Sequence, residues 1–229
     1  MLNWIVFEGI DCSGKTSCAQ FVTKQLIQHN TNVQFTAEPA LDVGKVAKDI
    51  DEHYLQFNKG MRAEIRSVLK THHLNDSDRL SLFLIDRCGL LQYLKEATCD
   101  VVCQDRSYIS TLVYQSVYLD KPVDYLMALN DAVFATVYDT RPDIIFYLKA
   151  SPAEARQRSI LRAQDVLDKK AIDKFDLFVE KYDWLLEQQH LKDIDSKFRG
   201  RIITVNTIKK PLTVVKAEIF EHIRELILC

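Results

Sequence analysis

Eight consecutive residues near the start of the chain have the types and the spacing that hold phosphate groups. They match the pattern Gly-x-x-x-x-Gly-Lys-Thr and are Gly9, Ile10, Asp11, Cys12, Ser13, Gly14, Lys15 and Thr16. In this pattern backbone N–H groups of the loop and of the following helix converge on phosphate oxygens, the lysine reaches the terminal phosphates, and the threonine hydroxyl binds Mg²⁺. The sequence therefore predicts a P-loop that binds a nucleoside triphosphate with Mg²⁺, with Ser17 completing the binding stretch. A glycine-rich turn without a ligand is the alternative.

A second ligand for Mg²⁺ is expected at Asp105. This residue closes a strand-like run, where P-loop proteins carry a carboxylate that holds the ion directly or through water. A plain helix cap is the alternative for this carboxylate.

Asp11 places a negative charge inside the phosphate-binding loop. In a site for a triphosphate alone this charge would oppose phosphate binding. We therefore expect the carboxylate to accept hydrogen bonds from a sugar hydroxyl of a phosphoryl acceptor. Capping of the following helix is the other interpretation.

Two further groups of residues have the chemistry of an acceptor site. Phe83 and Arg87 are four residues apart on an expected helix, Arg79 to Lys95, so they share one face, where a ring can stack on a base. A buried guanidinium needs a partner, either an internal carboxylate or a ligand. The stretch from Asp105 to Gln115 leaves the sheet with an arginine, hydroxyls and an aromatic ring, which suits an anionic acceptor. A core pair at Phe83 and Arg87, and ordinary surface chemistry in the second stretch, are the alternatives.

The pattern of apolar runs along the chain predicts an α/β fold. Short buried strands alternate with helix-like stretches, and this alternation is typical of a parallel sheet with helices on both faces. The five predicted strands are Asn3 to Glu8, Val33 to Ala37, Val101 to Gln104, Ile144 to Leu148 and Ile202 to Val205. The stretch from Lys45 to Leu74 is expected to be helical.

Composition restricts the partners of the protein. The 229 residues fit one domain, 1–229, and 30 Lys and Arg against 32 Asp and Glu leave a formal net charge of −2. Such a chain has no global positive field for a nucleic acid polymer or an anionic membrane. Without a signal-like start, a long apolar run or Cys-x-x-Cys pairs, we expect a cytoplasmic protein with free thiols that acts on small-molecule nucleotides.

Taken together, these residues resemble the thymidylate kinase family of P-loop nucleoside-monophosphate kinases. The resemblance covers most of the chain in order. It lies in residues 7–16, Glu38-Pro39, Phe83-x-x-x-Arg87, residues 105–115 and residues 141–158. It implies a P-loop kinase fold with ATP as phosphoryl donor, deoxythymidine monophosphate as acceptor and a homodimer.

The resemblance also implies roles for individual residues of the acceptor site. Phe83 would stack on the thymine and Arg87 would hydrogen-bond to it, while Arg106 would hold the acceptor phosphate. Glu38 and Pro39 would line the same site. By the same resemblance Ser110 and Thr111 would lie near base and phosphate, Asp11 would face the deoxyribose, and Tyr114 would exclude a 2′-hydroxyl.

A lid is implied over roughly residues 156–174, where three arginines lie, at Arg156, Arg158 and Arg162. Phosphoryl transfer needs positive charge on the transferring group, and the position after Asp11, basic in some family members, is Cys12 here. We therefore expect Arg158 and Arg162 to supply that charge. A solvated helix face is the alternative for these arginines.

The chain departs from the family after the second strand. Members tend to have Arg-Glu-Pro-Gly-Gly-Thr there, whereas this chain has residues 37–42, Ala-Glu-Pro-Ala-Leu-Asp. A positive charge and two glycines are missing, for which Lys45 or Lys48 would compensate. Two other functions stay open: a deoxynucleoside kinase, in which the Glu of Glu-Pro acts as base for a 5′-hydroxyl, and a regulator that binds nucleotides without transfer.

Overall fold

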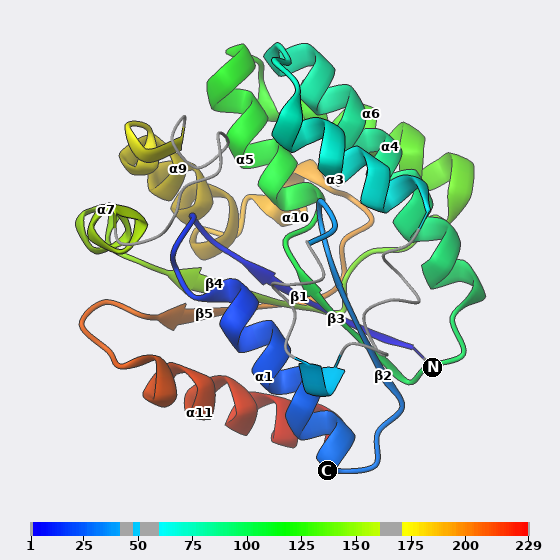
Figure 1. Ribbon diagram of the computed structural model, residues 1–229, viewed down its shortest axis with the longest axis vertical. Helices are drawn as coiled ribbons and strands as arrows, with labels where there is room; N and C mark the ends of the chain where they lie inside the picture. The colour runs from blue at the N-terminus through cyan, green and yellow to red at the C-terminus, as the bar shows by residue number, and fades with distance from the viewer. Residues whose placement is uncertain (1, 42–47, 51–59, 161–170, 229) are drawn as a thin grey trace.

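Five parallel strands form the centre of the protein. The computed structural model describes residues 2–41, 48–50, 60–160 and 171–228 (Figure 1). The strands are β1 (Asn3–Glu8), β2 (Val33–Ala37), β3 (Val101–Asp105), β4 (Ile144–Lys149) and β5 (Arg201–Asn206). Their order in the sheet is β2-β3-β1-β4-β5, and every neighbouring pair is parallel. The predicted strands are confirmed to within one residue at each end.

Helices cover both faces of this sheet, as the sequence predicted (Figure 1). The longer ones are α1 (Lys15–Gln28), α3 (Met61–Thr71), α4 (Asp76–Glu96), α5 (Tyr108–Leu119), α6 (Val123–Val137), α7 (Pro152–Ile160), α9 (Phe175–Tyr182) and α11 (Leu212–Ile223). Shorter turns are η2 (Lys48–Ile50), η3 (Asp183–Glu187), α10 (Leu191–Ile194) and η4 (Arg224–Leu228). Among the described helices, none has the length and apolar character that a membrane span requires.

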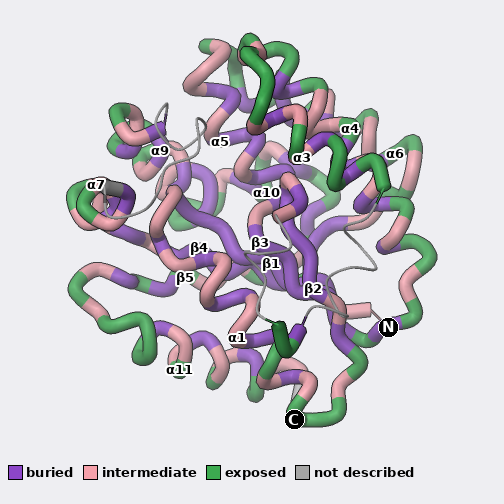
Figure 2. Tube along the Cα trace, in the orientation of Figure 1, coloured by how far each residue is buried: buried purple, intermediate pink, exposed green. Residues whose placement is uncertain are grey.

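Two cores lie on opposite faces of the sheet because successive strand residues point to opposite sides. On β1, Trp4 and Val6 pack in the cluster that includes residues of α4, α5, α6 and α9, while Ile5 and Phe7 pack in the cluster of α1 and α11. Figure 2 shows the strands buried at the centre and the exposed positions on the outer helices. A sheet buried on both faces explains why the strands read as continuous apolar runs.

Helix α4 begins at Asp76, three residues before the predicted start. The Asn75 side chain accepts a hydrogen bond from the Asp78 backbone N at 2.8 Å, and the Asp78 side chain accepts one from the Asn75 backbone N at 3.4 Å. This capping box is a local signal in Asn75-x-x-Asp78 that the apolar periodicity did not include. The expected helix between Lys45 and Leu74 is confirmed for α3 and η2. The rest of that stretch lies outside the described residues, apart from Gly60, which precedes α3, and residues 72–74, which follow it.

A buried ion pair fixes α3 and α4 to the end of β2. Arg62 Nε and Nη2 donate to the two carboxylate oxygens of Asp86, each at 3.0 Å, and both side chains are 1% exposed. The same guanidinium donates to Thr36 Oγ1 at 3.0 Å and to the Ala37 carbonyl at 2.6 Å. Because these four hydrogen bonds join one guanidinium of α3 to α4 and to β2, three elements are held in one geometry.

We predict that Arg62→Gln lowers the free energy of unfolding by about 3–5 kcal/mol, because it leaves the Asp86 carboxylate buried without its cation. Urea denaturation followed by circular dichroism measures the change. The control is Arg224→Gln, which breaks an exposed pair with Glu221 and should change stability by less than about 1 kcal/mol. Equal effects of the two substitutions would contradict the prediction.

Candidate active site

The P-loop has the predicted strand–loop–helix geometry. It runs from the end of β1 at Glu8 to the start of α1 at Lys15. Gly14 precedes the helix with φ 102°, and Gly9 has φ 140°. A Cβ atom at Gly9 would lie 2.6 Å from the Leu148 carbonyl oxygen, so both the conformation and the space require glycine.

Lys15 is buried inside this loop. Its Nζ donates to the Ile10 carbonyl at 2.6 Å. Burial, assisted by the charge of Arg106, lowers the pKa of Lys15 to about 8, and three neighbouring carboxylates oppose this shift. The loop itself therefore holds the ammonium in place through a backbone carbonyl, and no described carboxylate forms an ion pair with it.

Thr16 and Asp105 form a pair of oxygen ligands. The Thr16 hydroxyl donates to Asp105 Oδ2, while Asp105 Oδ1 is buried without a hydrogen-bond partner among the described residues. Hard oxygen donors with a spare carboxylate oxygen suit Mg²⁺. The described residues contain no group of three or more His, Cys, Asp or Glu side chains that could hold a metal by themselves, so the ion would need phosphate oxygens as further ligands.

Two alternatives from the sequence are wrong for these carboxylates. Asp105 does not cap α5, because Ser107 is the N-cap residue and accepts from the Ile109 backbone N at 3.3 Å. Asp11 does not cap α1, whose N-cap is Gly14 without a side-chain hydrogen bond. Of the other loop positions, Ser13 is buried with a hydroxyl that lacks a partner among described residues, and Ser17 lies in the first turn of α1.

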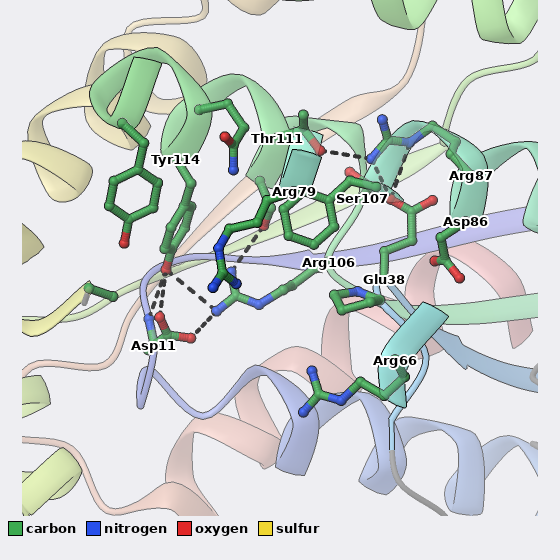
Figure 3. A pocket seen from close by; sticks show the side chains of 16 residues that line it. Asp11, Glu38, Arg66, Arg79, Asp86, Arg87, Arg106, Ser107, Thr111 and Tyr114 are labelled. Carbon is green, nitrogen blue, oxygen red and sulfur yellow. Dashed lines mark hydrogen bonds and ion pairs between the residues drawn. The ribbon is translucent and has the colours of Figure 1, made fainter. Parts of the chain in front are cut away.

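A pocket opens beside the P-loop, between the ends of β2 and β3 and helices α4 and α5 (Figure 3). All nine residues that the sequence pointed to for the acceptor line it: Asp11, Glu38, Pro39, Phe83, Arg87, Arg106, Ser110, Thr111 and Tyr114. Residues not singled out also line it: Arg66, Arg79, Asp86, Ser107, Gln115, Tyr118 and Ala171. The structure thus brings together residues as far apart in the sequence as Asp11 and Ala171.

Arg87 has an internal carboxylate as partner and faces the pocket as well. Its Nη2 and Nε donate to Glu38 Oε2 at 2.6 and 3.2 Å, Nη2 donates to Thr111 Oγ1 at 2.9 Å, and Nη1 donates to Asn130 Oδ1. Burial raises the pKa of the Glu38 carboxyl, although the Arg87 charge opposes this. Phe83, one turn earlier on α4, is half-buried and offers its ring to the pocket.

Arg106 connects this pocket to the P-loop. Its Nη2 forms an ion pair with Asp11, and its Nη1 donates to Ser110 Oγ at 3.1 Å. The Tyr114 hydroxyl donates to Asp11 Oδ2 at 3.1 Å, and the guanidinium lies 5.1 Å from the centre of the Tyr114 ring. Burial alone would raise the pKa of Asp11, but Arg106 and Lys15 lower it overall. The Arg106 backbone has φ 67°, a left-handed conformation that only a few per cent of non-glycine residues adopt.

Glu8 lies beside the site, and no role was predicted for it. This fully buried carboxylate accepts from the Ser107 backbone N (2.6 Å), Ser107 Oγ (2.8 Å), Ser110 Oγ (2.7 Å) and the Tyr182 hydroxyl (2.9 Å). It therefore fixes the start of α5, which carries the pocket hydroxyls. Its one signal is a charged residue closing a buried strand, the position from which ligands are reached in parallel sheets.

The predicted lid arginines have different positions. Arg158 Nη1 donates to the Cys12 carbonyl at 3.2 Å, and its Nη2 donates to Glu154 at 3.1 Å. It thus lies against the P-loop. Arg156 instead pairs with Asp176. Arg162 lies outside the described residues, as do Lys45 and most of the lid, while Lys48 in η2 does not line the pocket.

Known proteins resemble this chain in sequence and in fold. A family model described as thymidylate kinase matches residues 7–205. A probable thymidylate kinase of Methanococcus maripaludis is 29% identical over 226 residues, covering 97% of this chain and 96% of that protein. A thymidylate kinase of Campylobacter jejuni is 29% identical over 174 residues, covering 75% of this chain and 77% of its own length.

A solved structure of thymidylate kinase from Ehrlichia chaffeensis superposes with a TM-score of 0.63 at 19% identity, covering 97% of this chain and 98% of that one. At this identity the likeness establishes the shared fold. The family model extends from the end of β1 to the end of β5. The chain therefore belongs to the thymidylate kinase family.

Proposed function

We propose that the protein transfers the γ-phosphoryl group of ATP to the 5′-phosphate of deoxythymidine monophosphate, giving the diphosphate. The observation that carries this proposal is the Asp11–Arg106 ion pair, which joins the P-loop to the acceptor pocket. An arginine at that junction suits an acceptor that is itself anionic. Family membership supports the same substrates.

Each half of the acceptor has a matching part of the pocket. The thymine would stack on Phe83, with Arg87 and Thr111 as hydrogen-bonding groups at its edge. Its phosphate would lie at Arg106, and Tyr114, which is held against Asp11, would face the sugar. Glu38 would line the base end of the site, with its Oε2 held by Arg87.

The donor site would use the stretch from Gly9 to Ser17 for the phosphates of ATP. Thr16 and Asp105 would hold Mg²⁺, which neutralises phosphate charge when bound. These are the oxygens that the structure presents together, one of them without a partner among the described residues.

Catalysis would consist of positioning and charge neutralisation. An oxygen of the acceptor phosphate forms a bond to the γ-phosphorus as the bond from that phosphorus to the ADP oxygen breaks. Because the attacking oxygen is already anionic, neither a base nor a covalent intermediate is required. Lys15, Arg106 and Arg158 would stabilise the charge, and we extend this role to Arg162 on sequence grounds alone.

The family likeness also leads us to propose a homodimer that works in the cytoplasm on small nucleotides and binds no nucleic acid polymer. We further propose that residues 1–229 form one catalytic domain with a lid near 156–174.

A substrate panel tests the proposed reaction. With Mg-ATP, coupled ADP formation should be fastest with deoxythymidine monophosphate among all common deoxynucleosides and their monophosphates. Lys15→Ala should lower kcat/KM roughly 100- to 1,000-fold, because it removes a preorganised cation from the phosphates. Lys192→Ala, which removes an exposed lysine of α10, is the control and should leave turnover unchanged. Turnover of nucleosides alone, or binding without any turnover, would overturn the proposal.

The lowered pKa of Lys15 predicts proton uptake when ATP binds. Lys15 loses its proton near pH 8 in the free protein, and a bound triphosphate stabilises the charged form, so its pKa must rise on binding. At a pH of about 8.5 binding should therefore take up a proton, and ATP affinity should fall as pH rises through about 8. Calorimetry in two buffers with different ionisation enthalpies measures the uptake. Lys15→Arg stays charged and should show none; equal wild-type enthalpies in both buffers would refute the assignment.

A further inference from the structure

One arginine of the acceptor pocket has no partner that would account for its burial. Arg79 lies in the first turns of α4, four residues before Phe83 and eight before Arg87, so the three share one face of the helix. Its side chain lines the pocket, as Figure 3 shows, and the residue is only 6% exposed. This position was predicted only as the start of a helix, without a chemical role.

Two nitrogen atoms of the Arg79 guanidinium lack a hydrogen-bond partner among the described residues. They are Nε and Nη1, and both are buried. Two other buried arginines in this region and the partly buried Arg106 all have carboxylate partners: Arg62 with Asp86, Arg87 with Glu38, and Arg106 with Asp11. A buried charge without a partner costs several kcal/mol. Such a group is best explained when a ligand supplies the missing anion.

The charge of Arg79 acts on the same end of the pocket as Arg106. Burial raises the pKa of the Tyr118 hydroxyl; Asp11 and Asp76 raise it further, and Arg79 and Arg106 both lower it. Asp11 and Arg106 offset each other as an ion pair. Arg79 therefore adds positive charge that no described carboxylate pairs with, where a dianionic group would arrive.

We propose that Arg79 binds the 5′-phosphate of the acceptor nucleotide together with Arg106. This inference rests on the proposed function and names a contact within it. In this proposal Arg79 supplies the charge of the arginine missing at Ala37; of the two lysines expected in that role, Lys48 does not line the pocket and Lys45 lies outside the described residues. Helix α4 thus supplies both ends of the acceptor site: Arg87 and Phe83 for the base, and Arg79 for the phosphate.

Calorimetric binding of two ligands tests this contact. Arg79→Gln should weaken the binding of deoxythymidine monophosphate at least about 30-fold, the loss expected when one partner of a buried charge pair is removed. The binding of thymidine, which lacks the phosphate, should change less than about twofold. Arg79→Lys, which keeps the charge without the fork of donors, should give an intermediate loss. Equal losses for both ligands would place the contact on the nucleoside and overturn the proposal.

Thermal unfolding without ligand separates binding from structural support. Arg79→Gln should keep or raise the melting temperature of the free protein, because it removes an unpaired buried charge, whereas Arg62→Gln should lower it. A drop in the melting temperature of Arg79→Gln as large as that in Arg62→Gln would show a structural role and overturn the proposal.

Wild-type turnover is measured beside these variants. Its absence would defeat the proposed function and this inference together, whereas normal turnover with unchanged phosphate-dependent affinity in Arg79→Gln would defeat only the inference.

Discussion

The register of two neighbouring strands places Asp11 and Arg106 next to each other, and they form an ion pair. Asp11 follows β1 in the P-loop, and Arg106 follows β3, whose residue Asp105 lies opposite Phe7 of β1. The Arg106 backbone N donates to the Phe7 carbonyl at 3.0 Å, which continues the ladder past the end of the strand. The sheet therefore sets the position of the ion pair. Backbone hydrogen bonds of the sheet therefore hold the P-loop and the pocket next to each other.

Three carboxylates close the neighbouring strands, and each has a different environment. Glu8 is surrounded by hydroxyl and N–H donors, Glu38 is paired with a guanidinium, and Asp105 accepts from a single threonine and keeps one oxygen without a described partner. Because both of its carboxylate oxygens accept two hydrogen bonds each, Glu8 is a fixed support for the start of α5. The incomplete shell of Asp105 suits a cation that arrives with its substrate. The same residue type thus serves structure in one place and ligand binding in another, and the hydrogen-bond count distinguishes them.

The parts that the sequence predicted correctly are those controlled by local patterns. The strands follow from apolar runs, and the P-loop follows from the spacing of Gly9, Gly14 and Lys15. Spacing could not decide whether Arg87 pairs internally, since its partner Glu38 lies 49 residues away. The role of Glu8 was missed for the same reason, because its donors come from α5 and α9. Arg79 was predicted only as the start of a helix, and its burial follows from tertiary packing that helical spacing does not show.

The acceptor pocket combines apolar walls with charges that are mostly neutralised in advance. Pairing Arg87 with Glu38 holds the guanidinium in place before a base arrives, so little ordering is left to be done on binding. A pocket in which every charge were paired would repel neither anion nor cation, and would discriminate poorly between a nucleoside and its monophosphate. An unpaired arginine changes this balance at some cost in stability, since in a low-dielectric cavity its field favours an anion strongly. Preference for a phosphorylated acceptor then depends on Arg79, which is buried in this pocket without a counter-charge among the described residues.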